Sequence, residues 1–226
     1  MLNSDCLVIV PAYNEAQNLR KVIEELRIFF KNILVIDDGS DDGTLDIIKK
    51  LDINYITHFV NLGQGAALES GFNFFVKESL CDYVITFDGD GQNRAIDAKN
   101  MIEFAKKKKY SAVLGTRFRN KDDYRQIPLK KRIVLYLARA YEKIFFQINL
   151  SDAHNGLRVL DKKLVKNYII PIKNFDMNHA TEISYKIFKS KCNLAEYPVR
   201  VDYHNKRSQN PINAINIALK NFFKPL

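Results

Sequence analysis

The 226-residue sequence predicts an α/β protein built on a mainly parallel central sheet. Short runs of β-branched and aromatic residues alternate with longer segments whose apolar residues recur at helical spacing. Three of the short runs end in acids or polar loops, which is typical of strands that carry side chains to a ligand-binding edge. No linker, internal repeat or low-complexity tract divides the chain, so we expect one domain covering residues 1–226.

The elements follow one another as strand and helix through the first half of the chain. Strands are expected at residues 6–10, 33–36, 54–59, 83–87, 112–115 and 194–203. Helices are expected at residues 19–30, 44–51, 61–76, 96–109 and 177–187, and a last amphipathic helix follows a basic loop at residues 206–210. Strand and helix in alternation favour a parallel sheet covered by helices.

Composition limits the class of protein and suggests its partners. The formal net charge of +9 predicts an acidic partner, which is a phosphate compound, anionic lipid or nucleic acid. No apolar run reaches the roughly 18 residues of a membrane span. The first residues do not resemble a secretory signal, and three scattered cysteines form no disulfide pattern. We therefore expect a cytoplasmic protein with reduced thiols.

Two carboxylates separated by one glycine, Asp88-Gly89-Asp90, follow the expected strand at residues 83–87. Magnesium and manganese take oxygen ligands, and a phosphate group of the substrate commonly completes their coordination. The pattern therefore predicts a divalent metal that holds a diphosphate. An ordinary turn is the alternative interpretation of the same residues taken alone.

Polar loops also follow the first two strands. Pro11-Ala12-Tyr13-Asn14-Glu15 offers Tyr13 as a stacking face and Glu15 as an acceptor, and Asp37-Asp38 begins the loop after the second strand. Independent turns would not place such residues at three strand ends, so the combination favours a nucleotide and metal site.

The segment from Arg117 to Lys143 is rich in Lys and Arg interleaved with apolar residues. A basic amphipathic helix of this kind lies on anionic membrane or packs on the core with a solvated edge, and both interpretations stay open. Nucleic acid is not the expected partner, because the basic residues are not interleaved with aromatic stacking platforms on a sheet.

The motifs resemble those of glycosyltransferase family 2, and the first half is most similar to its dolichyl-phosphate mannose synthase-like branch in a soluble short form. The resemblance lies in residues 10–15, 37–44 and 87–92, and it continues at residues 61–67, 116–117, 154–158 and 196–199. It implies the GT-A fold, a Rossmann-like three-layer sandwich with a mainly parallel central sheet. In this fold residues 1–116 would form the nucleotide-sugar half, and residues 117–226 the acceptor-side half with basic amphipathic helices.

The family further implies an inverting, metal-dependent transfer from a UDP- or GDP-sugar to a glycan or lipid-linked acceptor in cell-surface polysaccharide or glycolipid synthesis. Asp88 and Asp90 would bind magnesium or manganese, and Arg117 would stabilise the leaving diphosphate. Residues expected on the donor are Pro11, Ala12, Tyr13, Glu15, Asp37, Asp38, Gln64, Asp88, Gly89, Gln92 and Lys206. Gln64 stands where relatives commonly have a lysine.

The acceptor decides whether a general base is needed. A hydroxyl acceptor needs one, for which Glu182, Asp152 and His179 are the candidates, whereas a phosphate acceptor is already a nucleophile. If the acceptor is a polyprenyl phosphate, Arg117, Arg158 and the basic helix would instead hold the lipid phosphate at a membrane. A polyprenyl-phosphate glycosyltransferase and a non-catalytic nucleotide- or polyanion-binding protein are therefore the alternative functions.

Overall fold

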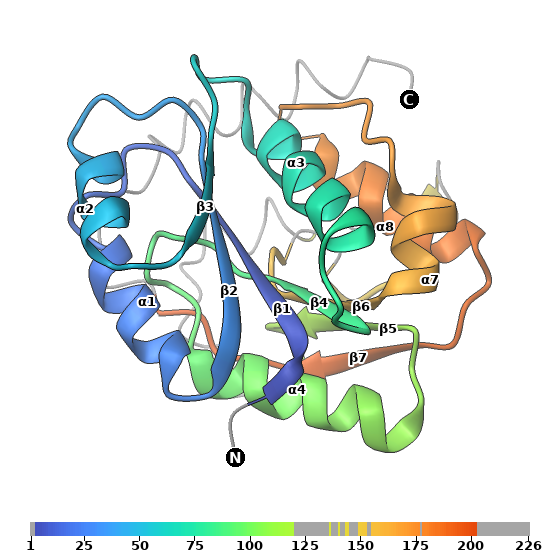
Figure 1. The fold of residues 1–226 in the computed structure, drawn as a ribbon. Coiled ribbons are helices and arrows are strands. Elements are labelled where there is room, and N and C mark those ends of the chain that lie inside the picture. Colours follow the sequence, from blue (N-terminus) through green and yellow to red (C-terminus); the bar gives the residue numbers. More distant parts are fainter. Residues whose placement is uncertain are drawn as a thin grey trace.

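The computed structural model describes residues 3–119, 136, 140, 143, 144, 149–152, 155–176 and 178–202. Within these residues, strands form one sheet in the order β3-β2-β1-β4-β6-β5-β7 (Figure 1). The strands are β1 (Asn3–Ala12), β2 (Phe30–Asp37), β3 (Asn54–Thr57), β4 (Tyr83–Thr86), β5 (Ala112–Thr116), β6 (Arg158–Asp161) and β7 (Leu194–Pro198). The helices are α1 (Leu19–Arg27), α2 (Thr44–Lys50), α3 (Gln64–Lys77), α4 (Ala95–Lys108), α7 (Lys162–Leu164), the π-helix η1 (Val165–Ile169) and α8 (His179–Lys189).

The sheet is mainly parallel, as the sequence predicts. β1 pairs in parallel with both β2 and β4, β2 pairs in parallel with β3, and β5 pairs in parallel with β7. β6 runs antiparallel to its two neighbours, β4 and β5. The predicted α/β class and the three-layer arrangement are confirmed.

Helices cover both faces of the sheet. α1, α2 and α4 pack on one face, and α3, η1 and α8 pack on the other (Figure 1). The central strand β1 shows why its sequence is a continuous apolar run. Val8 and Val10 belong to the first core cluster, whereas Leu7 and Ile9 belong to the second. A strand buried on both faces has no polar alternation.

The order of the strands defines where a ligand binds. From β1 the chain passes to β2 and β3 on one side, and then β4 is added on the other side of β1. The crevice outside the carboxyl ends of the strands at such a switch point is the usual ligand site of open α/β sheets. The loops after β1 and β4 therefore flank the expected position of a ligand.

Several predicted bounds differ from the structure. The strand predicted at residues 194–203 ends at Pro198, and the one predicted at 54–59 ends at Thr57. Each makes one more bond to the end of its neighbouring strand, from Val199 N–H to the carbonyl of Thr116 and from His58 N–H to the carbonyl of Asp37, and the chain then turns to loop contacts. The sequence does not predict β6, since Arg158 and Asp161 enclose just two apolar residues. The basic segment between Arg117 and Lys143 lies mostly outside the described residues.

The three cysteines form no disulfide. Cys6 and Cys81 are buried, Cys192 is half-buried, and all three thiols are free. In the part of the chain that the structure describes, no helix combines the length and apolar character required to cross a bilayer.

Gly71 allows α3 to pack closely on the sheet. A Cβ at this position would lie 2.6 Å from Cγ2 of Ile9 and 3.1 Å from Cδ1 of Ile36. We predict that Gly71→Ala lowers the free energy of unfolding by about 1–3 kcal/mol, because the β-branched Ile9 cannot move away within the core. The same substitution at an uncrowded helix position would stabilise by about 1 kcal/mol.

Urea denaturation measures this effect. Lys77→Ala, at the exposed end of the same helix, is the control and should change stability by less than about 0.5 kcal/mol. An unchanged or higher unfolding midpoint for Gly71→Ala would contradict the close contact.

Candidate functional site

The loops after β1, β2 and β4 lie side by side at one edge of the sheet. Backbone hydrogen bonds continue past the strands, from Asp38 N–H to the carbonyl of Ala12 at 2.8 Å and from Phe87 N–H to the carbonyl of Ile9 at 3.0 Å. A Cβ on Gly89 would lie 3.1 Å from the carbonyl oxygen of Pro11. The three loops singled out in the sequence therefore meet, and only a small residue suits position 89.

The loop after β1 is fixed by the loop after β2. The N–H groups of Asn14 and Glu15 donate to the hydroxyls of Ser40 (3.0 Å) and Thr44 (2.9 Å). In return, Asn14 Oδ1 accepts from Asp41 N–H at 3.0 Å. Tyr13 projects from this braced loop and is one of the exposed aromatic side chains. A flat ring held in this way can stack on a planar ligand.

Glu15 and Asp37, predicted on the donor, also have local contacts. The Glu15 carboxylate accepts from Asn18 Nδ2 at 2.9 Å, at the start of α1. Asp37 is buried and its Oδ1 accepts from Ser40 N–H at 3.2 Å. These acids shape the loops that carry Tyr13.

Asp38 is buried, and both of its carboxylate oxygens are used within the protein. Oδ1 contacts His58 Nδ1 at 2.7 Å and accepts from Leu62 N–H at 3.0 Å. Oδ2 accepts from Gly63 N–H at 2.8 Å and from Asn61 Nδ2 at 3.1 Å. Asp38 therefore holds the segment that leads into α3, which the sequence did not reveal.

Asp88 and Asp90 lie together after β4. Asp88 Oδ1 accepts from Gln64 Nε2 at 2.9 Å, and Asp88 Oδ2 accepts from Asn93 Nδ2 at 3.3 Å. Asp90 Oδ1 accepts from Gln92 N–H at 3.0 Å. Burial and the negative charge of Asp90 raise the pKa of Asp88 to about 6, although the buried Arg158 acts in the opposite direction. Two crowded carboxylates gain from a nearby cation.

The ligand types at this position fit magnesium or manganese. Asp88 and Asp90 offer only oxygen atoms, which hard divalent cations prefer. Within the described residues, no cluster of three or more acidic, histidine or cysteine side chains could enclose a metal ion. A cation held here would need further oxygens from a ligand such as a diphosphate, so the site fits a metal that binds together with its substrate.

Arg117 and Asp152 form a buried ion pair beyond β5. Arg117 Nε and Nη2 each donate to one Asp152 oxygen at 2.6 Å, and the Arg117 N–H donates to Oδ2 at 3.1 Å. Such a paired arrangement fixes the plane of the guanidinium. Two residues predicted for separate roles are thus direct partners.

Glu182 holds a neighbouring segment of backbone. Its oxygens accept from Lys173 N–H at 2.9 and 3.1 Å, from Asn174 N–H and Nδ2 at 2.8 Å each, and from Lys186 Nζ at 2.6 Å. Burial alone would raise the pKa of Glu182, but these donors outweigh it and the pKa is lowered. His179, three residues earlier, places Nδ1 2.6 Å from the carbonyl of Asp176.

The segment that Glu182 holds packs against the start of α3. Gly65 N–H donates to the carbonyl of Phe175 at 3.1 Å, and a Cβ on Gly63 would lie 2.2 Å from the same oxygen. Gln64 stands between these glycines and reaches Asp88. The contacts of Glu182 therefore contribute indirectly to the position of Gln64.

Some site residues were missed by the sequence or were placed differently. Asn93 was not singled out, although it contacts Asp88. Gly156 passes so close that a Cβ would lie 2.4 Å from Asp88 Oδ2. Arg158, considered for a lipid phosphate, is fully buried on β6. Arg158 stands between two apolar residues, Leu157 and Val159. This pattern could have predicted that the arginine side chain is buried.

Lys206 and the loop around it lie outside the described residues. The residues just before them bond to the loop after β4, since Asp202 N–H donates to the carbonyl of Gln92 at 2.8 Å and Val201 pairs with Asn93. The described chain therefore ends next to the loop that carries Asp88 and Asp90.

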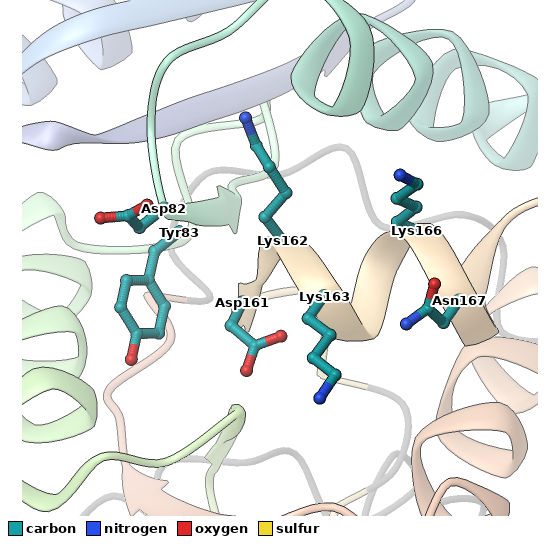
Figure 2. Close-up of a pocket in the computed structure, with 7 residues that line it drawn as sticks. All are labelled: Asp82, Tyr83, Asp161, Lys162, Lys163, Lys166 and Asn167. Carbon is teal, nitrogen blue, oxygen red and sulfur yellow. The ribbon is translucent and has the colours of Figure 1, made fainter.

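A depression of about 670 Å³ lies elsewhere, at the opposite end of β4. It is lined by Asp82, Tyr83, Asp161, Lys162, Lys163, Lys166 and Asn167 (Figure 2). Figure 2 shows that Lys163 points to the other side of its helix from Lys162 and Lys166, so the three ammonium groups do not converge. It contains none of the predicted site residues.

Known relatives extend over the whole chain. A UDP-N-acetylglucosamine–dolichyl-phosphate N-acetylglucosaminyltransferase of Methanococcus voltae is 26% identical, covering 97% of this chain and 94% of the relative. An uncharacterised protein of Methanocaldococcus jannaschii is 29% identical, covering 97% of this chain and 92% of the relative.

Solved structures and a family model agree with these relatives. Glucosyl-3-phosphoglycerate synthase from Mycobacterium tuberculosis, in complex with Mn²⁺, UDP and phosphoglyceric acid, has a TM-score of 0.69 at 15% identity, covering 99% of this chain and 80% of that one. At this identity the similarity shows the fold. The model of glycosyl transferase family 2 matches residues 7–169, which is well over half of the sequence. The chain therefore belongs to glycosyl transferase family 2 and is a glycosyltransferase.

Proposed function

We propose that this protein transfers a sugar from a nucleoside diphosphate sugar to a polyprenyl phosphate, with inversion at the anomeric carbon and with a divalent cation. The assignment of the donor site rests on one observation. The loop that contains Tyr13 lies beside the loop that contains Asp88 and Asp90, at the switch point of the sheet. We assign residues 1–116 to the donor side and residues 117–226 to the acceptor side.

On the donor side, Tyr13 stacks on the base, while Pro11 and Ala12 line the ribose beside Gly89. Glu15, Asp37 and Asp38 act by holding these loops in place, as their hydrogen bonds indicate. A uridine nucleotide is the first choice, since UDP is named in the M. voltae relative and is bound in the M. tuberculosis structure.

Asp88 and Asp90 would hold magnesium or manganese together with the donor diphosphate. When bound, the cation supplies positive charge against the diphosphate as it leaves. Gln64 and Asn93 orient the two oxygens of Asp88. Gln92 fixes Asp90 through its N–H group, and we assign its side chain to the donor diphosphate.

Lys206 is proposed as a further phosphate contact. It follows Asp202 by four residues, and four residues span at most about 14 Å. Because Asp202 is bonded to Gln92, this length allows the lysine to reach the diphosphate.

The contacts of Asp152 and Glu182 support a phosphate acceptor. A hydroxyl acceptor must lose a proton to a base, but Asp152 is paired with Arg117, and Glu182 is occupied by backbone and amide donors. A phosphate acceptor is already anionic. Its oxygen forms the bond to the anomeric carbon while the bond to the diphosphate breaks and the electron pair leaves with the nucleotide.

In this mechanism the two acids are positioning residues. Asp152 orients Arg117, whose charge attracts the phosphate groups that meet at the reaction centre, and Glu182 holds the segment packed against α3. The name of the M. voltae relative, which includes dolichyl phosphate, supports this acceptor class.

A donor and acceptor panel tests the proposal. The protein is incubated with UDP- and GDP-sugars, with manganese, magnesium or chelator, and with either a short-chain polyprenyl phosphate or the corresponding polyprenol. We expect release of nucleoside diphosphate only with metal and only with the phosphate acceptor. Metal-dependent transfer to the polyprenol hydroxyl, with no response to the polyprenyl phosphate, would refute the acceptor assignment.

We expect Asp90→Asn to raise the thermal stability of the free protein and to abolish its metal-dependent activity. Below about pH 4 the raised pKa of Asp88 adds stability, and this contribution is lost as the pH rises through about 6. Removing the charge of Asp90 should therefore raise the unfolding temperature of chelator-treated protein at pH 7.5, with a smaller gain at pH 4. Asparagine keeps an oxygen for the Gln92 N–H.

The same variant should lose metal-dependent stabilisation by UDP and metal-dependent transfer, as measured by thermal unfolding and UDP release. Asp41→Asn, in an exposed position of the neighbouring loop, is the control and should behave as the wild type. Full transfer activity in Asp90→Asn would contradict the assignment of Asp90 as a metal ligand.

Glu182→Gln distinguishes positioning from proton transfer. The amide places a donor where the carboxylate accepts from Lys173, Asn174 and Lys186, so we expect the free energy of unfolding to fall by about 1–3 kcal/mol. The transfer rate should fall less than about tenfold with an unchanged pH profile. A loss of at least about a thousandfold at unchanged stability would instead identify a general base.

A further inference from the structure

Large apolar side chains are exposed next to the donor site. Phe59, Val60 and Leu62 lie in the loop between β3 and α3, and Phe175 lies in the segment before α8. The two segments adjoin at Gly63, where a Cβ would lie 2.2 Å from the carbonyl oxygen of Phe175 and 3.7 Å from its Cβ. We call these four residues the apolar patch. Single exposed apolar residues are common, but a group of them on adjoining segments marks an interaction surface.

The loop is held in its exposed position by bonds to the protein. His58, Asn61, Leu62 and Gly63 all contact the carboxylate of Asp38. The backbone at Val60 also packs on Gly39, where a Cβ would lie 2.5 Å from the Val60 carbonyl carbon. The loop is therefore built to present Phe59 and Val60 outward, and an ordered loop loses little entropy when it binds.

The patch lies at the site edge of the sheet. Figure 1 shows the loop between β3 and α3 projecting past the strands at the end of the molecule where β1 and β2 finish. Only Gly63 separates Leu62 from Gln64, which bonds to Asp88 at 2.9 Å. Whatever binds the patch is thus close to the donor site.

We propose that Phe59, Val60, Leu62 and Phe175 insert into the surface of an anionic lipid bilayer and hold the site at the membrane. This inference rests on the proposed function, because a polyprenyl phosphate is met at a bilayer. The formal net charge of +9 favours association with anionic lipid, and the exposed residues on the two sides of Phe175 carry one charge of each sign, Lys173 and Asp176. Exposed aromatic and aliphatic side chains on a basic protein are typical of surfaces that lie in the membrane interface.

The test is sedimentation with vesicles of phosphatidylcholine and phosphatidylglycerol, compared with phosphatidylcholine alone. The double variant Phe59→Ser/Val60→Ser should bind the anionic vesicles at least about tenfold more weakly than the wild type, because two inserted apolar side chains are lost. Leu80→Ser is the matched control. Leu80 is fully exposed but precedes β4, at the opposite edge of the sheet, so binding should be unchanged.

Three results would overturn the proposal: unchanged vesicle binding by the double variant, an equal loss in Leu80→Ser, or a wild type that binds neither kind of vesicle. Light scattering after size exclusion gives a fourth result that would overturn it. If the wild type is a dimer and the double variant is a monomer that still binds vesicles, the apolar patch joins two copies of the chain instead.

Failure of the membrane inference can be told apart from failure of the proposed function. Vesicle binding is measured without donor or metal, and transfer to a short-chain polyprenyl phosphate in solution is measured without vesicles. The double variant should keep the wild-type rate in solution and lose activity only toward a long-chain acceptor in anionic vesicles. A wild type without transfer in solution would count against the proposed function, whatever the vesicles show.

Discussion

The buried carboxylate of Asp38 is the contact on which the arrangement of the site depends. Its two oxygens join the end of β2 to the segment that leads into α3, through His58, Asn61 and two backbone N–H groups. That segment sets where α3 begins, and the first residue of α3 reaches Asp88. A buried carboxylate is costly unless its oxygens are satisfied, so the segment can hardly take another path without losing several bonds at once.

The acids of the site divide into two physical classes. Asp38, Asp152 and Glu182 have their charge compensated by donors within the chain, which makes them structural fixtures. Asp88 and Asp90 instead lie close in the chain, and burial together with the negative charge of Asp90 raises the pKa of Asp88. The second class is unfavourable in the free protein, and a cation held there, as proposed above, would stabilise it. Uncompensated charge with a shifted pKa is typical of functional positions, where a ligand supplies the opposite charge.

Much of the fold and part of the site could be predicted from the sequence. β1, β2 and β4 are apolar runs with polar ends, so both their existence and their shared edge follow from patterning. β6 could not be predicted, since a four-residue strand with charged ends has no period to detect. The partners of Asp38 and Glu182 could not be predicted either. A carboxylate can accept a hydrogen bond from the backbone N–H of almost any residue, so the sequence does not reveal which residue donates. Arg117 and Asp152 are separated by 35 positions, and only the folded chain pairs them.

The insertion of β6 between β4 and β5 has a consequence for how the chain is made. β4 and β5 are complete by residue 116, yet neither pairs with the other, and both bond to residues 158–161. As the polypeptide leaves the ribosome, β4, which leads into Asp88, keeps one side unpaired until residues 158–161 are made, roughly seventy residues later. An unpaired apolar strand edge is a template for aggregation. The nascent protein is therefore most vulnerable to misassociation during this interval, and chaperone contact would protect it most effectively there.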